Sequence, residues 1–357
     1  MSAQKAPVVV PAGRLEAIVR AIFSSLGSSE REAGLIARHL VEANLRGHDS
    51  HGIGMIPAYV ANGLSGHMVV NNSLATVLDS GTLLICDGGQ GAGQVMAHDA
   101  MALGIERARE HGSCILGLRN SHHIGRIGHW AEQSVAAGLV SIHFVNVVSE
   151  PAVVPFGGTQ PRMGTNPFAI GIPRPGSDPI ILDFATSRWA VGKIRVAFNK
   201  GEAIPEGYLL DAQGRPTTNP GDLFTSPPGG LLTFGEHKGW GMSLACELLA
   251  AALTGGKTQT GPRASPAILN SMLAVIVSPD RLGTAGPFAE SLENVVRWVQ
   301  SENGAGGAQV RLAGGPERET RARRLAEGIP VDPSTWDLVL TAGEQAGLTR
   351  EAVDAIR

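Results

Sequence analysis

Residues 46–54 read Arg-Gly-His-Asp-Ser-His-Gly-Ile-Gly, a run of five polar or ionisable side chains set among glycines. The packing of a hydrophobic core does not require such a run of polar residues. Glycine lets the backbone turn sharply or approach a ligand closely, and imidazoles exchange protons near neutral pH. Residues 120–128, Asn-Ser-His-His-Ile-Gly-Arg-Ile-Gly, have the same character. We therefore predict that the two runs face each other across an active site.

The composition is that of a folded protein with a small-molecule partner. A chain of 357 residues suggests two or three domains. Hydrophobic residues make up 43% and charged residues 17%, which argues against general disorder. The net charge of -3 gives no attraction to nucleic acid or to anionic membranes. We expect neither as a partner.

Cysteine usage and the N-terminus predict a cytoplasmic protein. Cys86, Cys114 and Cys246 are far apart and show no spacing typical of a disulfide framework or a zinc site. Residues 1–11 do not have the pattern of a secretory signal. No apolar run approaches the roughly 20 residues that span a bilayer.

Periodicity places the first polar run between two helices. Apolar residues recur at helical spacing from Arg14, and Gly27 ends that helix. Ser29 with Glu32 has the spacing of a capping box for a second helix, which ends near Arg46. Pro57 suits the first turn of a third helix. Residues 74–78 and 83–86 predict a hairpin, and the alternation of strands and helices that follows predicts an α/β domain with mixed strand directions.

The usual nucleotide-binding motifs are absent. No Gly-x-Gly-x-x-Gly occurs, and the residues 256–258, Gly-Lys-Thr, lack the glycine that a P-loop needs at position 251. Residues 151–187 instead place polar groups at the ends of apolar runs, where loops bind ligands. His237 and Lys238 open an apolar helix, and a helix N-terminus with a nearby lysine attracts phosphate. A nucleotide would be held in a different way from a Rossmann fold.

Five motifs carry a family resemblance. They are Gly-His-Asp-Ser-His-Gly at 47–52, Asn-Ser-His-His-Ile-Gly at 120–125, Gly-Thr-Asn-Pro at 164–167, Asp-Phe-Ala-Thr-Ser at 183–187 and His-Lys-Gly at 237–239. In this order they resemble the malate/L-lactate dehydrogenase family that lacks a Rossmann fold, which includes ureidoglycolate dehydrogenase and diketogulonate reductase. The likeness runs from about residue 15 to residue 329.

The resemblance implies an α/β fold of the sulfolactate dehydrogenase type and a homodimer. A mixed-sheet cofactor domain would comprise residues 75–231 and 309–330. A discontinuous helical domain would comprise residues 1–74 and 232–308, and residues 331–357 would form a C-terminal helical tail.

The resemblance also implies NAD- or NADP-dependent interconversion of 2-oxo and 2-hydroxy acids. The substrate would be pyruvate-like, with aryl-pyruvate and 2-oxoglutarate as candidates, and malate/lactate- or ureidoglycolate-type activity is the alternative within the family. His51 would donate the proton with Ser50 and Asp183 as relay partners, and His123 matches the acid/base of some members. Cofactor contacts would lie at His51, Gly125, Arg126, Ile127, Ile181, Leu182, Asp183, Phe184, Ala185, His237, Asn270, Ala313, Gly314, Gly315 and Pro316.

Two positions depart from the family pattern: residues 313–315 read Ala-Gly-Gly where relatives often have Pro-Gly-Glu, and residue 55 is a methionine. Several members carry an arginine where this chain has Met55, and an arginine can hold a substrate carboxylate with two parallel hydrogen bonds. Arg126 and Arg195 are candidates to replace it. Arg126, inside the second polar run, is the stronger candidate, whereas Arg195 could equally be a solvated surface arginine. Met55 favours a substrate with a less charged side chain.

The candidate residues also have purely structural interpretations. His51 could cap a helix end, and an aspartate such as Asp183 commonly caps a helix N-terminus. Adjacent residues seldom face the same way, so of His122 and His123 one would cap the helix beginning near Ile124 and the other would face the site. Chemically, reduction of a 2-oxo acid needs a proton for the carbonyl oxygen, and a histidine with a pKa of about 6.5 supplies it.

Two functions of other classes remain open. The histidines at 48, 51, 122, 123 and 129 could bind zinc in a hydrolase or lyase, but no His-Glu-x-x-His or cysteine pattern supports this, and we assign no metal. The chain could also be a catalytically silent binding protein of the same fold.

Overall fold

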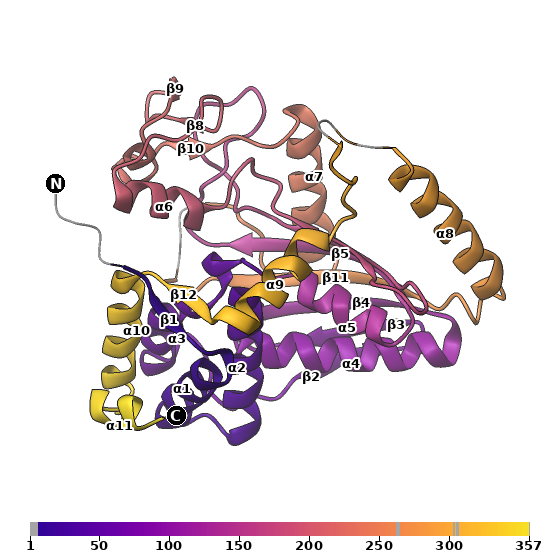
Figure 1. Ribbon diagram of the computed structural model, residues 1–357, viewed down its shortest axis with the longest axis horizontal. Coiled ribbons are helices and arrows are strands. Elements are labelled where there is room, and N and C mark those ends of the chain that lie inside the picture. Colours follow the sequence, from indigo (N-terminus) through magenta and orange to yellow (C-terminus); the bar gives the residue numbers. More distant parts are fainter. Residues whose placement is uncertain (1–5, 262–264, 303, 305–306, 357) are drawn as a thin grey trace.

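The computed structural model describes residues 6–261, 265–302, 304 and 307–356. Helices from both ends of the chain pack into one helical layer (Figure 1). The N-terminal part supplies α1 (Ala12–Ser25), α2 (Glu30–Leu45) and α3 (Ile56–Leu64), and the C-terminal part supplies α10 (Pro333–Gln345) and α11 (Arg350–Ala355). Strands β1 (Val8–Val10) and β12 (Ile329–Val331) pair antiparallel and join the two ends of the chain. The helices at residues 333–355 thus pack with the N-terminal helices.

The predicted helix boundaries in this layer are confirmed. Gly27 follows α1 with a φ of +100°, a conformation that glycine adopts without strain. The Ser29 hydroxyl accepts a hydrogen bond from the Glu32 backbone N–H at 3.3 Å. The other half of the predicted capping box is absent, because the Glu32 carboxylate accepts hydrogen bonds from the Asn71 backbone N–H at 3.0 Å instead.

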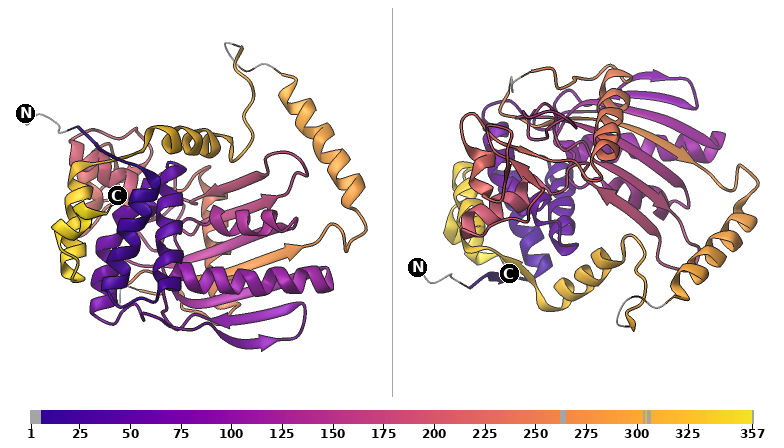
Figure 2. Two further views of the ribbon diagram at one scale, coloured as in Figure 1. Left: turned by 60° about the horizontal axis from the view of Figure 1, so that its bottom comes forward. Right: turned by 90° about the horizontal axis from the view of Figure 1, so that it is seen from above.

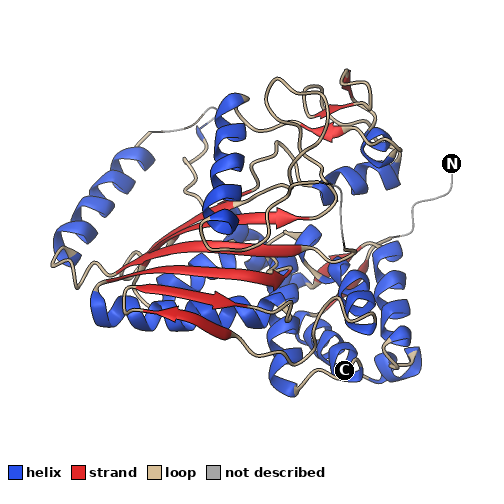
Figure 3. Cartoon of the chain, turned by 180° about the vertical axis from the view of Figure 1, so that it is seen from behind, coloured by secondary structure: helices blue, strands red, loops and turns tan. Residues whose placement is uncertain are grey.

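A mixed sheet forms the second layer (Figures 1 and 3). Among the described residues it has seven strands in the order β2-β3-β4-β11-β5-β6-β7, and only β3 and β4 run parallel. The strands are β2 (Ala75–Asp79), β3 (Leu83–Asp87), β4 (Ser113–His122), β5 (Val140–Val148), β6 (Phe168–Ile172), β7 (Ile180–Phe184) and β11 (Leu269–Val277). The predicted hairpin and the mixed strand directions are confirmed. Helices α4 (Gly93–His111) and α5 (Gly128–Ala136) cover one face, and α7 (His237–Glu247), continued by the π-helical turn η4 (Leu248–Ala252), covers part of the other.

The expected division into domains is wrong for residues 232–308 and in part for residues 309–330. Strand β11 comes from the first of these segments, yet it lies in the middle of the sheet between β4 and β5. The family resemblance implied a helical domain for this segment, and periodicity does not say where a strand is inserted. From the second segment, α9 (Gly315–Glu327) packs on α2 rather than on the sheet.

Two further parts flank the sheet. A small lobe combines α6 (Val191–Lys200), the 3-10 turn η3 (Pro220–Phe224) and the strands β8 (Leu209–Leu210), β9 (Pro216–Thr217) and β10 (Gly230–Leu231) around its own apolar cluster. Helix α8 (Ala285–Gln300) projects away from the body (Figure 2). The main core is continuous from the helical layer into the sheet, so the residues between these layers have fixed positions.

Candidate active site

The first polar run forms a tight connection between α2 and α3. It consists of two 3-10 turns, η1 (Asp49–His51) and η2 (Ile53–Met55). The Asp49 carboxylate accepts hydrogen bonds from Asn44 at 2.6 Å and from Arg324 of α9 at 2.7 and 3.0 Å. The Asn44 side-chain oxygen accepts from the Ile53 backbone N–H at 2.8 Å. These contacts hold the loop from both sides.

The two polar runs meet through His51 and His123, as predicted. The centroids of the two rings are 5.7 Å apart and the ring planes differ by 25°, so the rings stack. His51 Nδ1 contacts the Ser50 hydroxyl at 3.0 Å, and His123 Nδ1 contacts the Tyr59 hydroxyl at 2.6 Å. In the described part of the chain, neither Nε2 atom has a hydrogen-bond partner. Both imidazoles therefore present a free edge.

His122 turns away from this pair, as the alternation of a strand requires. Its Nε2 atom accepts a hydrogen bond from Asn62 at 3.0 Å, and its side chain is 1% exposed. Burial lowers the pKa of His122 to about 4. Of the two neighbouring histidines, His123 is therefore the one whose ring lies against His51, and β4 extends to His122 instead of ending at Leu118.

His51 is neutral at pH 7. Burial, followed by the proximity of His48, lowers the pKa of His51 to about 4, although the Asp183 carboxylate acts in the opposite direction. Burial, followed by the proximity of His51, also holds the pKa of His123 well below its ordinary value. The expectation that His51 has the ordinary histidine pKa of about 6.5 is therefore wrong, because the sequence does not show that its ring is buried away from water.

Residues Gly125, Arg126 and Ile127 form the turn that leads into α5. Gly125 has a φ of +74°, and a Cβ atom there would overlap the buried ring of His39. The Arg126 backbone N–H donates to His39 Nε2 at 2.9 Å. Asn270 of β11 accepts from the Ile124 N–H at 2.9 Å, so it supports the same turn. Of these residues, His39 was not among the sequence candidates.

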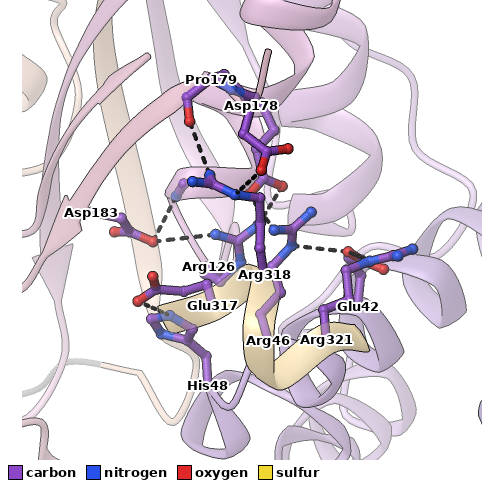
Figure 4. A network of polar contacts seen from close by, with 12 residues as sticks. Glu42, Arg46, His48, Arg126, Asp178, Pro179, Asp183, Glu317, Arg318 and Arg321 are labelled. Atoms are coloured by element: carbon purple, nitrogen blue, oxygen red, sulfur yellow. Dashed lines mark hydrogen bonds and ion pairs between the residues drawn. The ribbon is translucent and has the colours of Figure 1, made fainter. Parts of the chain in front are cut away.

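Asp183 and Arg126 interact with each other rather than directly with His51 (Figure 4). The Asp183 carboxylate accepts from the Gly128 N–H at 2.8 Å and lies 3.6 Å from the Arg126 guanidinium, which also pairs with Glu132. Asp183 thus caps the N-terminus of α5 and reaches His51 through its charge alone. Because two carboxylates already hold Arg126, which is 3% exposed, it is not a free carboxylate clamp.

A small cavity collects several of the expected cofactor residues. Its lining includes Arg126, Ile181, Asp183 and Gly314, and its volume is about 20 Å³. The Ile181 N–H donates to the Ala313 carbonyl at 3.2 Å, which brings β7 next to the start of α9. Gly315 and Pro316 form the first turn of α9.

Other expected cofactor residues lie apart from this cavity. Leu182 and Phe184 point to the opposite face of β7 from Asp183, and the Phe184 ring meets that of Phe234 at 5.2 Å. Ala185 follows directly at the end of the strand. His237 is exposed at the N-terminus of α7, and its ring lies 5.8 Å from that of Phe156. The exposed Arg195 guanidinium lies 4.0 Å from the Phe224 ring centroid in the small lobe.

Helix α9 joins this cavity to the loop that carries His51 (Figure 4). Glu317 lies 3.7 Å from His48, and Arg321 donates to Glu42 at 2.7 Å. Arg318 donates to the Pro179 carbonyl at 2.9 Å and thus fixes the loop before β7. Glu317, Arg318 and Arg321 were not among the sequence candidates, because an arginine-rich helix has the pattern of an exposed surface.

The described ranges, which omit residues 1–5, 262–264, 303, 305–306 and 357, contain neither a candidate metal site nor a candidate membrane span. There, no three histidine, cysteine, aspartate or glutamate side chains are arranged so that they could share a metal ion. In the same ranges, no helix combines the length and the apolar character needed to cross a bilayer.

Comparison with known proteins agrees with this architecture. The family described as malate/L-lactate dehydrogenase matches residues 10–339. Hydroxycarboxylate dehydrogenase B of Escherichia coli (strain K12) is 48% identical over 344 residues, which is 96% of this chain and 95% of that protein. An L-lactate dehydrogenase of Cupriavidus necator is 41% identical over 84% of this chain and 87% of its own length.

The fold agrees as well. The structure of sulfolactate dehydrogenase from Methanocaldococcus jannaschii superimposes with a TM-score of 0.86 at 29% identity, covering 96% of this chain and 99% of that one. The expected sulfolactate dehydrogenase type of fold is therefore confirmed. The chain belongs to the malate/L-lactate dehydrogenase family and is an oxidoreductase that acts on CH–OH groups.

Proposed function

We propose that the protein is an NAD(P)-dependent 2-hydroxycarboxylate dehydrogenase that reduces a pyruvate-like 2-oxo acid and oxidises the corresponding 2-hydroxy acid. The observation that carries the proposal is the stacked pair His51 and His123, each held at Nδ1 and free at Nε2. Two such nitrogens can contact one small polar substrate. A cytoplasmic location is part of the proposal, since all three cysteines are free and buried.

The cavity residues fit a nicotinamide cofactor. Asp183 has one carboxylate oxygen with no partner among the described residues, and such an oxygen suits a ribose hydroxyl. The Arg318 guanidinium of α9 also lines the cavity, and a guanidinium suits a phosphate. When bound, the cofactor supplies or accepts the hydride at the substrate carbon. Residues Gly125, Arg126 and Ile127, together with Ala313, Gly314, Gly315 and Pro316, would hold it.

His51 would move the proton at the substrate oxygen. In oxidation, the neutral imidazole can accept the hydroxyl proton directly. In reduction it must first take up a proton, and the negative charge of a bound substrate carboxylate favours this as the Asp183 charge does. Ser50 holds Nδ1 in both states, because a hydroxyl can donate or accept.

The substrate side chain would be weakly charged. Met55, at the end of η2, packs against the main apolar core where several relatives carry an arginine. Because Arg126 is already held by two carboxylates, Arg195, whose guanidinium lies against the Phe224 ring, is the remaining candidate for holding a second carboxylate.

The protein would act as a homodimer. Helix α8 stands off the body and buries only Val296, while Trp298 is 79% and Val295 60% exposed (Figure 2). Large exposed apolar side chains on a projecting helix are typical of a protein interface.

Replacement of the proton donor tests the proposed reaction. His51→Ala should lower kcat with a panel of 2-oxo acids by about 10²–10⁴-fold, because a positioned acid or base contributes that much. Binding of NADH or NADPH, followed by nicotinamide fluorescence, should be nearly unchanged. His111→Ala, at an exposed helix end, is the matched control. An unchanged kcat in His51→Ala would remove His51 from the mechanism, and absence of oxidation or reduction with every acid tested would exclude the proposed substrate class.

A further inference from the structure

Tyr59 and His123 share a buried hydrogen bond that has no role in the reaction as proposed above. Tyr59 lies inside α3, is 1% exposed, and places its hydroxyl 2.6 Å from His123 Nδ1. Burial raises the pKa of Tyr59, so its phenol keeps the proton at neutral pH. The proton between the Tyr59 hydroxyl oxygen and His123 Nδ1 belongs to one of these two atoms, and which one it is determines the tautomer of His123.

The side-chain amide of Gln94, in α4, fixes the direction of this hydrogen bond. Its side-chain nitrogen lies 3.3 Å from the His123 carbonyl oxygen and 3.1 Å from the Tyr59 hydroxyl oxygen. A backbone carbonyl can only accept, so the end of the amide that faces it must be the nitrogen, which can only donate. The Tyr59 oxygen therefore accepts from Gln94. Among the described residues, His123 Nδ1 is then the one atom within hydrogen-bond distance that can accept the buried hydroxyl proton of Tyr59, so the proton points to it.

His123 Nδ1 is thus an acceptor and carries no proton. A neutral imidazole has one N–H, which must then be on Nε2. That atom lies on the opposite edge of the ring, has no partner among the described residues, and belongs to the ring that stacks on His51. His51 differs, because its Nδ1 faces the Ser50 hydroxyl, which accommodates either tautomer and the charged ring.

We propose that Tyr59, oriented by Gln94, is a positioning residue that fixes His123 as the Nε2–H tautomer, so that His123 donates a hydrogen bond to a substrate oxygen while His51 alone exchanges the proton. This inference rests on the proposed function. In reduction, a C–H bond forms at the carbonyl carbon and an O–H bond forms with the proton that leaves His51. The proton on His123 Nε2 stays on nitrogen throughout.

The tautomer can be read without any activity measurement. In wild-type protein labelled with ¹⁵N-histidine, long-range ¹H–¹⁵N spectra should show His123 with an unprotonated Nδ1 and a protonated Nε2, with His123→Gln used to assign the signals. Tyr59→Phe should move both nitrogens towards a mixture of tautomers. The only other tyrosine, Tyr208, lies in the small lobe, and Tyr208→Phe should leave them unchanged. A proton on Nδ1 in the wild type, or unchanged signals in Tyr59→Phe, overturns the proposal.

Kinetics separate the two histidines. Glutamine can donate a hydrogen bond but cannot exchange a proton, so His123→Gln should keep kcat within about 10-fold, while His51→Gln should lose about 10²–10⁴-fold. Tyr59→Phe should lower kcat about fivefold, the value of one hydrogen bond. Equal losses in His123→Gln and His51→Gln would overturn the division of roles. A wild type that reduces no 2-oxo acid would refute the proposed function, whereas the spectra would still test the tautomer.

Discussion

A substitution at Gly192 should displace the His51 side chain indirectly, through Ser50. Gly192 lies in the first turn of α6, where the small lobe meets the loop of His51. A Cβ atom added there would lie 2.5 Å from Ser50 Cβ. Ordinary contact between carbon atoms begins at 3.4 Å, so Ser50 or α6 must move by about 1 Å. The Asp49 contacts with Asn44 and Arg324 oppose a shift of the loop as a whole, so the strain falls on Ser50 and on its hydrogen bond to His51.

The expected loss of kcat is large because turnover depends on the exact position of the group that transfers the proton. A misplacement of about 1 Å costs about 100-fold in turnover, so Gly192→Ala should lower kcat for 2-oxo acid reduction by about that factor. Stability should change little, because alanine is a better helix former than glycine. Steady-state NADH oxidation and thermal unfolding measure the two quantities. Gly241→Ala in α7 is the matched control, since nothing lies within 4 Å of its Cβ position. A Gly192→Ala enzyme with wild-type kcat would refute the reasoning.

Two further outcomes concern stability and assembly. Burial lowers the pKa of His122 to about 4 and of His143 to about 3, so the unfolded chain gains protons below its ordinary histidine pKa of about 6.5 while the folded protein does not. The free energy of unfolding should therefore fall as the pH decreases, by about 2 kcal/mol for each of these groups between pH 7 and pH 5. Urea titrations at the two pH values measure this, and an equal stability at both would contradict it. Trp298→Asp should convert a dimer to a monomer in sedimentation velocity, whereas Leu338→Asp, at an exposed site on α10, should not; a monomeric wild type would remove α8 from consideration as an interface.

Local signals predicted the helices and the hairpin well. The glycine after α1, the Ser29 cap and the proline in the first turn of α3 act within a few residues, and such interactions leave a pattern in the sequence. The two polar runs were recognised for the same reason, because their glycines and imidazoles are adjacent in the chain.

Features that depend on distant residues were missed. The insertion of β11 between β4 and β5 leaves no local signal, since an apolar strand is equally suited to an edge or a centre. Tyr59 and Gln94 were not candidates because each is a single polar residue on a helix with an apolar face. The only hint was that a buried tyrosine needs a partner for its hydroxyl. The low pKa of His51 required the burial around it, which no motif states.

The position of β11 also has a consequence for synthesis. During translation, β4 and β5 are complete more than a hundred residues before β11 emerges, and each then has an open edge in what will become the middle of the sheet. Unpaired edges attract other strands, including those of neighbouring nascent chains. Because this last strand must enter between two earlier ones, productive folding of the whole enzyme has to wait for its C-terminal third, and the interval before then is when the chain is most in need of chaperone protection.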